Sequence, residues 1–126
     1  MKIFLISSQV IFKKEEDLKD KKDGEYLQPN TKIFPSVDSL MKPNMLFQIT
    51  VSARHGVHHD GLLSALEKLG NPENPHLYFV VPKQLFDDLT FQSYTKKDKR
   101  VLEDCQIDGK VRAVSQFALC LSFEIK

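Results

Sequence analysis

Residues 45–81 carry the pattern that most limits what this chain can fold into: strand, helix, strand. The segment 45–53 (MLFQITVSA) alternates apolar and polar side chains, which predicts a strand. The segment 60–69 repeats leucine at helical spacing, and 77–81 (LYFVV) is apolar throughout, as in a strand covered on both faces. This order is typical of a βαβ unit, so we expect the two strands to run parallel in one sheet.

The ends of the predicted helix carry capping signals. Asp60 is the expected N-cap, because its carboxylate can accept hydrogen bonds from the backbone N–H groups of the first turn. Gly70 is expected to end the helix, since glycine adopts left-handed backbone without a steric penalty. We interpret the leucine stripe as core: it consists of Leu62, Leu63, Leu66 and Leu69.

A β-hairpin is predicted immediately before the helix. Residues 37–41 form a short strand candidate and 42–44 (KPN) a turn that leads into the strand 45–53. A hairpin centred on Pro43 places Asp38 directly opposite Gln48, with Cβ atoms roughly 5 Å apart. A slip of one residue would abolish this pairing.

The second strand of this hairpin has one polar face. Gln48, Thr50 and Ser52 share it, while the apolar residues between them lie on the other face. An acid that faces a polar Q-x-T beside a βαβ crossover resembles the core of PD-(D/E)XK nucleases. In those enzymes an Asp and a Glu on adjacent strands bind a divalent cation, and a nearby Lys positions and activates the attacking water.

Several short sequence segments, spread over roughly residues 24–120, carry a more specific resemblance. Its segments, in order, are 24–29 (GEYLQP), 34–39 (FPSVDS), 46–52 (LFQITVS) with His55, 77–82 (LYFVVP), Phe86, Gln92 and 116–119 (QFAL). Together they resemble the C-terminal part of Crinkler and retrotransposon-hot-spot (RHS) proteins. The resemblance implies a restriction-endonuclease-like module, which in many relatives belongs to effectors that act on host nuclei or to products of mobile-element conflict.

The resemblance also assigns roles to individual residues. It makes Asp38 the motif acid, with Gln48 in place of the Glu and Thr50 in place of the Lys. If the module is active, Asp38 and Gln48 hold Mg²⁺ while Thr50 and His55 help to place the water. Gln48 brings no negative charge and Thr50 no ammonium group, so two of the three positions depart from the active pattern.

Other polar clusters have weaker functional interpretations. His55, His58 and His59 precede the helix, but no second ligand cluster completes a zinc site, which favours a structural role. The basic run 96–100 (KKDKR) is interpreted as a solvated loop, with contact to a nucleic-acid backbone as the alternative.

The remaining segments complete an α/β pattern. Strands are predicted at 1–12 and 117–125, a short helix at 83–89, one helical turn near 101–105, and a peripheral charged run at 13–24. We expect a single restriction-endonuclease-like domain over 1–126, with a mixed central β-sheet and flanking helices. A PD-(D/E)XK core normally begins with a helix. Either the charged run, with Glu15 or Glu16, supplies that helix here, or the chain lacks it.

Composition bounds the class of protein. The 126 residues suffice for one core, and a formal net charge of +1 is well below that of dedicated nucleic-acid binders. The N-terminal apolar stretch is too short for a membrane span and has no small-residue cleavage site. Cys105 and Cys120 have no metal-type spacing, Cys120 is expected to be a buried thiol, and both favour a reducing compartment. We therefore expect an intracellular protein, nuclear or cytoplasmic.

Three functional hypotheses remain open from the sequence, and the weakest of them is a fragment whose exposed edges associate with a partner chain. The first is a degenerate nuclease-like domain with residual Mg²⁺-dependent phosphodiesterase chemistry on DNA or RNA. The second is a catalytically inactive, effector-type module that keeps the fold and binds protein or nucleic acid. The substituted motif and the near-neutral charge favour the second hypothesis.

Overall fold

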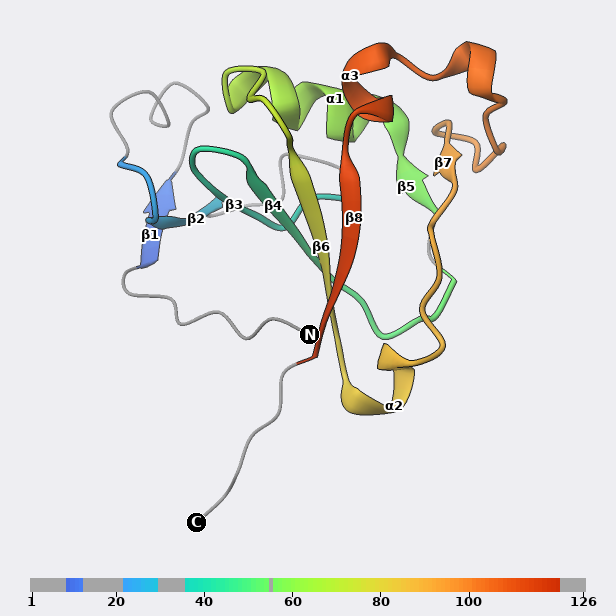
Figure 1. Cartoon of the computed structure of the whole chain (residues 1–126), viewed down its shortest axis with the longest axis horizontal. Helices are drawn as coiled ribbons and strands as arrows, with labels where there is room; N and C mark the ends of the chain where they lie inside the picture. The colour runs from blue at the N-terminus through green and yellow to red at the C-terminus, as the bar shows by residue number, and fades with distance from the viewer. Residues whose placement is uncertain (1–8, 13–21, 30–35, 55, 121–126) are drawn as a thin grey trace.

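The computed structural model describes residues 9–12, 22–29, 36–54 and 56–120, which build a mixed β-sheet with a few helices (Figure 1). The six-stranded sheet has the order β1 (Gln9–Phe12), β2 (Tyr26–Pro29), β3 (Ser39–Met41), β4 (Met45–Ile49), β6 (His76–Val81) and β8 (Ser115–Cys120). A separate pair joins β5 (Val57–His58) to β7 (Tyr94–Thr95). The predicted mixed α/β architecture is confirmed at this level.

The helices are short, apart from the predicted one. They are α1 (His59–Lys68), α2 (Lys83–Phe86), α3 (Gly109–Arg112) and a 3-10 turn, η2 (Asp104–Gln106). The helix expected at 60–69 is confirmed with ends shifted by one residue, and the helix expected at 83–89 stops early, at Phe86. The helix α3 was not predicted: the Asp108 side chain caps it by accepting a hydrogen bond from the Lys110 N–H at 2.9 Å.

The β3–β4 hairpin has the predicted register. Ser39 pairs with Phe47, Leu40 with Leu46, and Met41 with Met45, so the hairpin is centred on Pro43. Both strands are shorter than expected, because β3 begins at Ser39 and β4 ends at Ile49. The two strands therefore leave Asp38 and Thr50 just outside their regular pairing.

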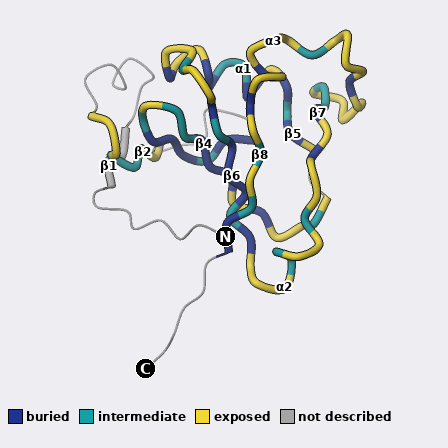
Figure 2. The backbone as a smooth tube through the Cα atoms, in the orientation of Figure 1, coloured by how far each residue is buried: buried dark blue, intermediate teal, exposed yellow. Residues whose placement is uncertain are grey.

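The predicted βαβ unit is also confirmed in its strand directions. β4 pairs with β6 in parallel, Met45 opposite His76, and β6 pairs in parallel with β8. β2, β3 and β4 form an antiparallel meander, whereas β1 runs parallel to β2. The central strands β4 and β6 are mostly buried, while α2 and the segments around α3 are largely exposed (Figure 2).

One face of the sheet packs against α1 and holds the main core. Leu46 on β4 and Leu77 and Phe79 on β6 are almost fully buried there with Leu62 and Leu66 of α1. Burial of such side chains stabilises the fold by about 1.5–3 kcal/mol each. Because Gln48 alternates with Phe47 along β4, it lies on this same covered face.

The opposite face carries a row of aromatic rings across four strands. Tyr26 lies 5.6 Å from Phe47, Phe47 lies 5.4 Å from Tyr78, and Tyr78 lies 5.2 Å from Phe117, measured between ring centroids. Burial raises the pKa of the Tyr78 hydroxyl above its usual value. The row ties the sheet together laterally through neighbouring aromatic pairs.

Two predictions about the ends of α1 have different outcomes. The expected N-cap Asp60 is wrong: the His58 side chain caps the helix, its Nδ1 accepting a hydrogen bond from the Gly61 N–H at 2.9 Å. Gly70 does follow the helix, with φ at +91°. The Gly70 and Asn71 N–H groups reach back to carbonyls of the last turn at 3.1 and 2.9 Å, which is a Schellman ending.

Replacing Gly70 with alanine should lower the free energy of unfolding by about 1–2 kcal/mol, because a Cβ disfavours left-handed backbone. A Cβ at Gly70 would meet no atom within 4 Å, so the loss comes from the backbone alone. Gly109→Ala is the matched control, because Gly109 also has open space and lacks a positive φ. Urea unfolding of both variants measures the difference, and equal stabilities would contradict the argument.

Several predicted segments extend beyond the described part of the chain. The strand predicted at 1–12 is seen as β1 over its last four residues, and residues 1–8 lie outside the described part. The strand predicted at 117–125 is seen as β8, and 121–126 lie outside. Glu15 and Glu16, proposed for a first helix, also fall outside. None of the described helices has the length and apolar character that a bilayer crossing requires.

Candidate functional site

Asp38 lies directly before β3, just beyond the last regular pair of the hairpin, Ser39 with Phe47. Its backbone N–H donates to the carbonyl of Phe47 at 2.8 Å, and its Oδ2 accepts a hydrogen bond from the N–H of Ile49 at 2.7 Å. The carboxylate is therefore held against the backbone of β4, one residue beyond Gln48. This contact fixes the orientation of an acid that is only partly buried.

Gln48 is the most unusual polar residue of the described chain. Its side chain is 2 % exposed on the covered face of the sheet, and its strand partner on β6 is Phe79. Among the described residues, its Oε1 has no hydrogen-bond partner. A buried acceptor left without a donor costs about 1–3 kcal/mol of stability.

Thr50 is buried at 5 % exposure, and its hydroxyl takes part in a local turn. The hydroxyl accepts a hydrogen bond from the Ser52 N–H at 3.2 Å and donates to the Ser52 carbonyl at 3.3 Å. Because a threonine hydroxyl has one proton to donate, the turn uses its donor capacity in this conformation. The turn that Thr50 forms with Ser52 therefore lies directly after the end of β4 at Ile49. His55, the fourth predicted site residue, lies outside the described residues.

His58, directly before α1, and His59, its first residue, both have structural partners. His58 caps the helix, and the ring of His59 is 5 % exposed. Its Nε2 accepts a hydrogen bond from the N–H of Asp108 at 3.0 Å, and its Nδ1 lies 2.9 Å from Oδ1 of Asp60. This pattern requires neutral imidazole with the proton on Nδ1. Within the described ranges, no three His, Cys, Asp or Glu side chains cluster as metal ligands.

The hydrogen bond from His59 lowers the pKa of the Asp60 carboxyl below its usual value of 3.8, and the charge of Lys96 acts in the same direction. The Lys96 Nζ lies 3.7 Å from the Asp60 Oδ1. The folded state therefore binds fewer protons here than the unfolded state. Asp60 contributes stability above pH 3.8, and that contribution disappears as the pH falls through its lower folded pKa.

Asp60→Asn should therefore be less stable than the wild type above pH 4, with a difference that shrinks in more acidic buffer. Denaturant midpoints measured for both proteins over a pH series give this difference directly. The effect is small, because the Asp60 side chain is 59 % exposed and solvent screens the interaction. A difference that stays constant down to the lowest pH would contradict the assignment.

Two glutamines that were noted for the family resemblance form a hydrogen-bonded pair. Gln92 is 4 % exposed, and its Nε2 donates to the carbonyls of Ala53 at 3.2 Å and Thr90 at 2.6 Å. The Gln116 amide bonds both the N–H and the carbonyl of Gln92, at 2.8 and 3.0 Å. The pair links the loop after β4 to β8. Their positions in the sequence gave no signal that they would meet.

The basic run 96–100 forms an exposed turn after β7. The Lys96 N–H donates to the carbonyl of Arg100 at 2.9 Å, and the Lys99 N–H donates to that of Lys96 at 2.8 Å. The Asp98 carboxylate accepts from the Arg100 N–H at 3.1 Å. Lys97, Lys99 and Arg100 face solvent, in agreement with a solvated loop.

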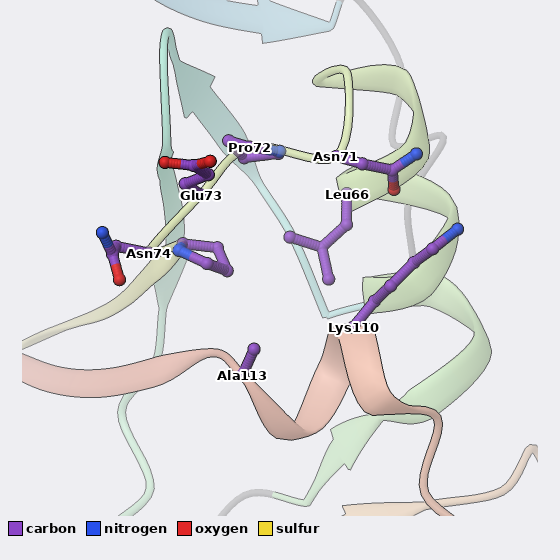
Figure 3. A pocket seen from close by; sticks show the side chains of 8 residues that line it. Leu66, Asn71, Pro72, Glu73, Asn74, Lys110 and Ala113 are labelled. Atoms are coloured by element: carbon purple, nitrogen blue, oxygen red, sulfur yellow. The ribbon is translucent and has the colours of Figure 1, made fainter.

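A cavity of about 380 Å³ lies between α3 and the loop before β6 (Figure 3). Leu66, Glu73, Asn74 and Lys110 are among the residues that line it. Because β4 and β6 are parallel, this cavity lies at the beginning of β6, whereas Gln48 lies near the end of β4. Neither Asp38 nor Gln48 lines the cavity, so the candidate site is separate from it.

Comparison with known proteins identifies no relative. No protein-family model matches the sequence, and neither the curated proteins nor the solved structures contain a significant match. The assignment of function therefore depends on the residues and their geometry.

Proposed function

We propose that this chain is a degenerate PD-(D/E)XK nuclease-like domain of Crinkler/RHS type, whose Asp38 and Gln48 bind a divalent cation. The observation that carries the proposal is the buried Oε1 of Gln48 without a hydrogen-bond partner among the described residues. The topology supports it, because the β3–β4 hairpin is followed by a helix and a parallel strand, as in the restriction-endonuclease-like layout.

The donor set fits Mg²⁺ in kind, since this ion prefers oxygen ligands and is often held through one or two carboxylates. Asp38 supplies a carboxylate whose orientation the Ile49 N–H fixes, and Gln48 supplies a neutral amide oxygen. One negative charge holds the ion less strongly than two. When bound, the ion would polarise a phosphodiester and lower the pKa of a bound water.

A Mg²⁺ titration monitored by thermal unfolding tests the site. Wild type should be stabilised progressively, because a ligand that binds the folded state alone raises its stability by mass action. Asp38→Asn should lose this response while keeping an acceptor for the Ile49 N–H. Asp87→Asn, an exposed acid after α2, should retain it. Equal responses in all three proteins would overturn the proposed ligand pair.

Activity is tested separately on plasmid, single-stranded DNA and RNA with and without Mg²⁺. Cleavage that depends on Mg²⁺ and disappears in Asp38→Asn would support the nuclease interpretation. Cleavage unaffected by Asp38→Asn would remove Asp38 from the site.

A second candidate is a catalytically inactive module that binds protein or nucleic acid, of the effector type. The hydrogen bonds of Thr50 favour this second candidate. By the resemblance, Thr50 stands where an active nuclease has its catalytic lysine, but it has no charge, and its hydroxyl proton is already donated to the Ser52 carbonyl. The same resemblance supports a nuclear or cytoplasmic location. Binding of labelled DNA and RNA without cleavage, measured by fluorescence anisotropy, would distinguish this module from the nuclease.

A further inference from the structure

We propose that His58 and His59 form an acid-sensitive latch, which holds the segment 104–112 against α1 at neutral pH and releases it when the two rings bind protons. Each ring accepts a hydrogen bond from a backbone N–H. Nδ1 of His58 accepts from the Gly61 N–H at 2.9 Å. Nε2 of His59 accepts from the Asp108 N–H at 3.0 Å. Because a backbone N–H can only donate, both of these nitrogens have to be unprotonated for the bonds to exist.

A proton on either ring removes its acceptor. The imidazolium ion carries an N–H on both nitrogens and has no lone pair left to accept a hydrogen bond. Histidine side chains change charge between about pH 5 and 8, so mild acid is sufficient. The charge on His58 would also lie at the N-terminus of α1, where the helix dipole disfavours a cation. Acidification therefore weakens the cap of α1 and its link to Asp108 together.

The charged groups around the rings allow the protons to bind. Oδ1 of Asp60 lies 2.9 Å from Nδ1 of His59, and its negative charge also attracts a proton to His58. Lys96, which follows β7, lies 3.7 Å from the same oxygen and opposes that attraction. Asp108, whose N–H contacts Nε2, carries a second negative charge at the start of α3. Because Nδ1–H of His59 donates to Asp60 in both states, protonation breaks the bond to Asp108 alone.

The segment that the latch holds has little buried surface of its own. η2 has no buried residue, and in α3 Val111 alone is buried. Lys110 and Ala113 form one wall of the cavity of about 380 Å³, beside Leu66 of α1 (Figure 3). Segments with few buried apolar contacts open locally at the lowest cost in free energy. Loss of the His59 bond should therefore move this wall of the cavity while the sheet stays intact.

Amide hydrogen exchange of the full chain, followed by mass spectrometry, tests the latch. Protection factors correct for the pH dependence of chemical exchange itself, so they can be compared between about pH 7.5 and about pH 5.5. The protection of 104–114 should fall on acidification, by roughly tenfold for each hydrogen bond lost. The protection of β6, in the centre of the sheet, should not change.

A variant that carries both His58→Asn and His59→Gln should lose this response to pH. The asparagine oxygen takes the place of Nδ1 and the glutamine oxygen that of Nε2, and neither side chain titrates. His76→Gln is the matched control, because the Nδ1 of His76 lies 3.0 Å from the Tyr78 hydroxyl on β6 and takes no part in the latch. This control should respond to pH as the wild type does.

Three results would overturn the proposal. They are a wild type with equal protection of 104–114 at both pH values, an equal fall in 104–114 and β6, and a double variant that keeps the wild-type response. Far-UV circular dichroism checks that the variants are folded. If the double variant is not, the comparison of 104–114 with β6 in the wild type and in His76→Gln decides alone. The measurement requires neither metal nor nuclease activity, so it is independent of the proposed function.

Discussion

Replacing Gln48 with leucine is expected to raise the free energy of unfolding by about 1–3 kcal/mol in Mg²⁺-free buffer. The side chain is 2 % exposed, and its Oε1 has no partner among the described residues. Leucine is similar in size and removes the unsatisfied acceptor from an apolar neighbourhood formed by Leu46 and Phe79. Urea unfolding monitored by circular dichroism measures the change.

Gln92→Leu provides the matched control, because Gln92 is an equally buried glutamine whose amide is hydrogen-bonded. Its Nε2 donates to the carbonyls of Ala53 and Thr90, and leucine would leave both without this donor. The variant should therefore lose about 1–3 kcal/mol. Two chemically identical substitutions at buried glutamines should thus change stability in opposite directions.

The Gln48 variant also connects stability to the proposed site. In Mg²⁺, Gln48→Leu should lose the stabilisation that the wild type gains, because the amide ligand is gone. A Gln48→Leu protein less stable than the wild type in Mg²⁺-free buffer would contradict the prediction. It would mean that the Gln48 amide makes a favourable interaction without the ion.

The second large effect is expected for Phe79→Ala, which should lower the free energy of unfolding by about 3–5 kcal/mol. Phe79 is 1 % exposed on the central strand β6, where its strand partners are Gln48 and Ala118. Truncation would leave a cavity between the sheet and α1 that neighbouring strands cannot close, because both are fixed by backbone pairing. Denaturant unfolding at constant pH measures the loss.

Phe91→Ala is the matched control for Phe79→Ala. Phe91 is 67 % exposed and contacts Tyr94 edge-on, with ring centroids 5.9 Å apart. Its truncation should lower stability by less than about 1 kcal/mol. A Phe79→Ala variant that loses no more stability than Phe91→Ala would show that the core can close around the missing ring.

Local signals were sufficient for much of the fold. The turn at Pro43, flanked by two β-prone segments, predicted the register that pairs Leu40 with Leu46. Leucine spacing predicted α1, and Gly70 predicted its end, because both signals depend on nearby backbone geometry. The apolar run 77–81 predicted a central strand, and β6 lies between β4 and β8. In each case the residues that determine the structure are close in sequence.

The candidate site was predicted less completely. The predicted pairing of Asp38 with Gln48 lies beyond the regular register, which stops at Ser39 and Phe47, and the carboxylate contact with the Ile49 N–H was not foreseen. The role of Thr50 in a turn with Ser52 was also missed. These contacts depend on where each strand stops, and strand ends are set by competition between ladder pairing and local side-chain hydrogen bonds.

The sequence by itself determined that β4 has two different faces, since side chains alternate along any strand. Only the tertiary structure decided how far each face is covered, because the face of Ile49 and Val51 is buried at Phe47, which is 4 % exposed, and open beyond it. Gln48 and Thr50 are buried at 2 % and 5 % exposure, whereas Ile49 and Val51 are exposed at 61 % and 83 %. The reason is that α1 packs on the side of Leu46 and Phe79, and this packing depends on residues from many parts of the chain. Burial without a partner is what makes Gln48 a candidate ligand, and it follows from that long-range packing.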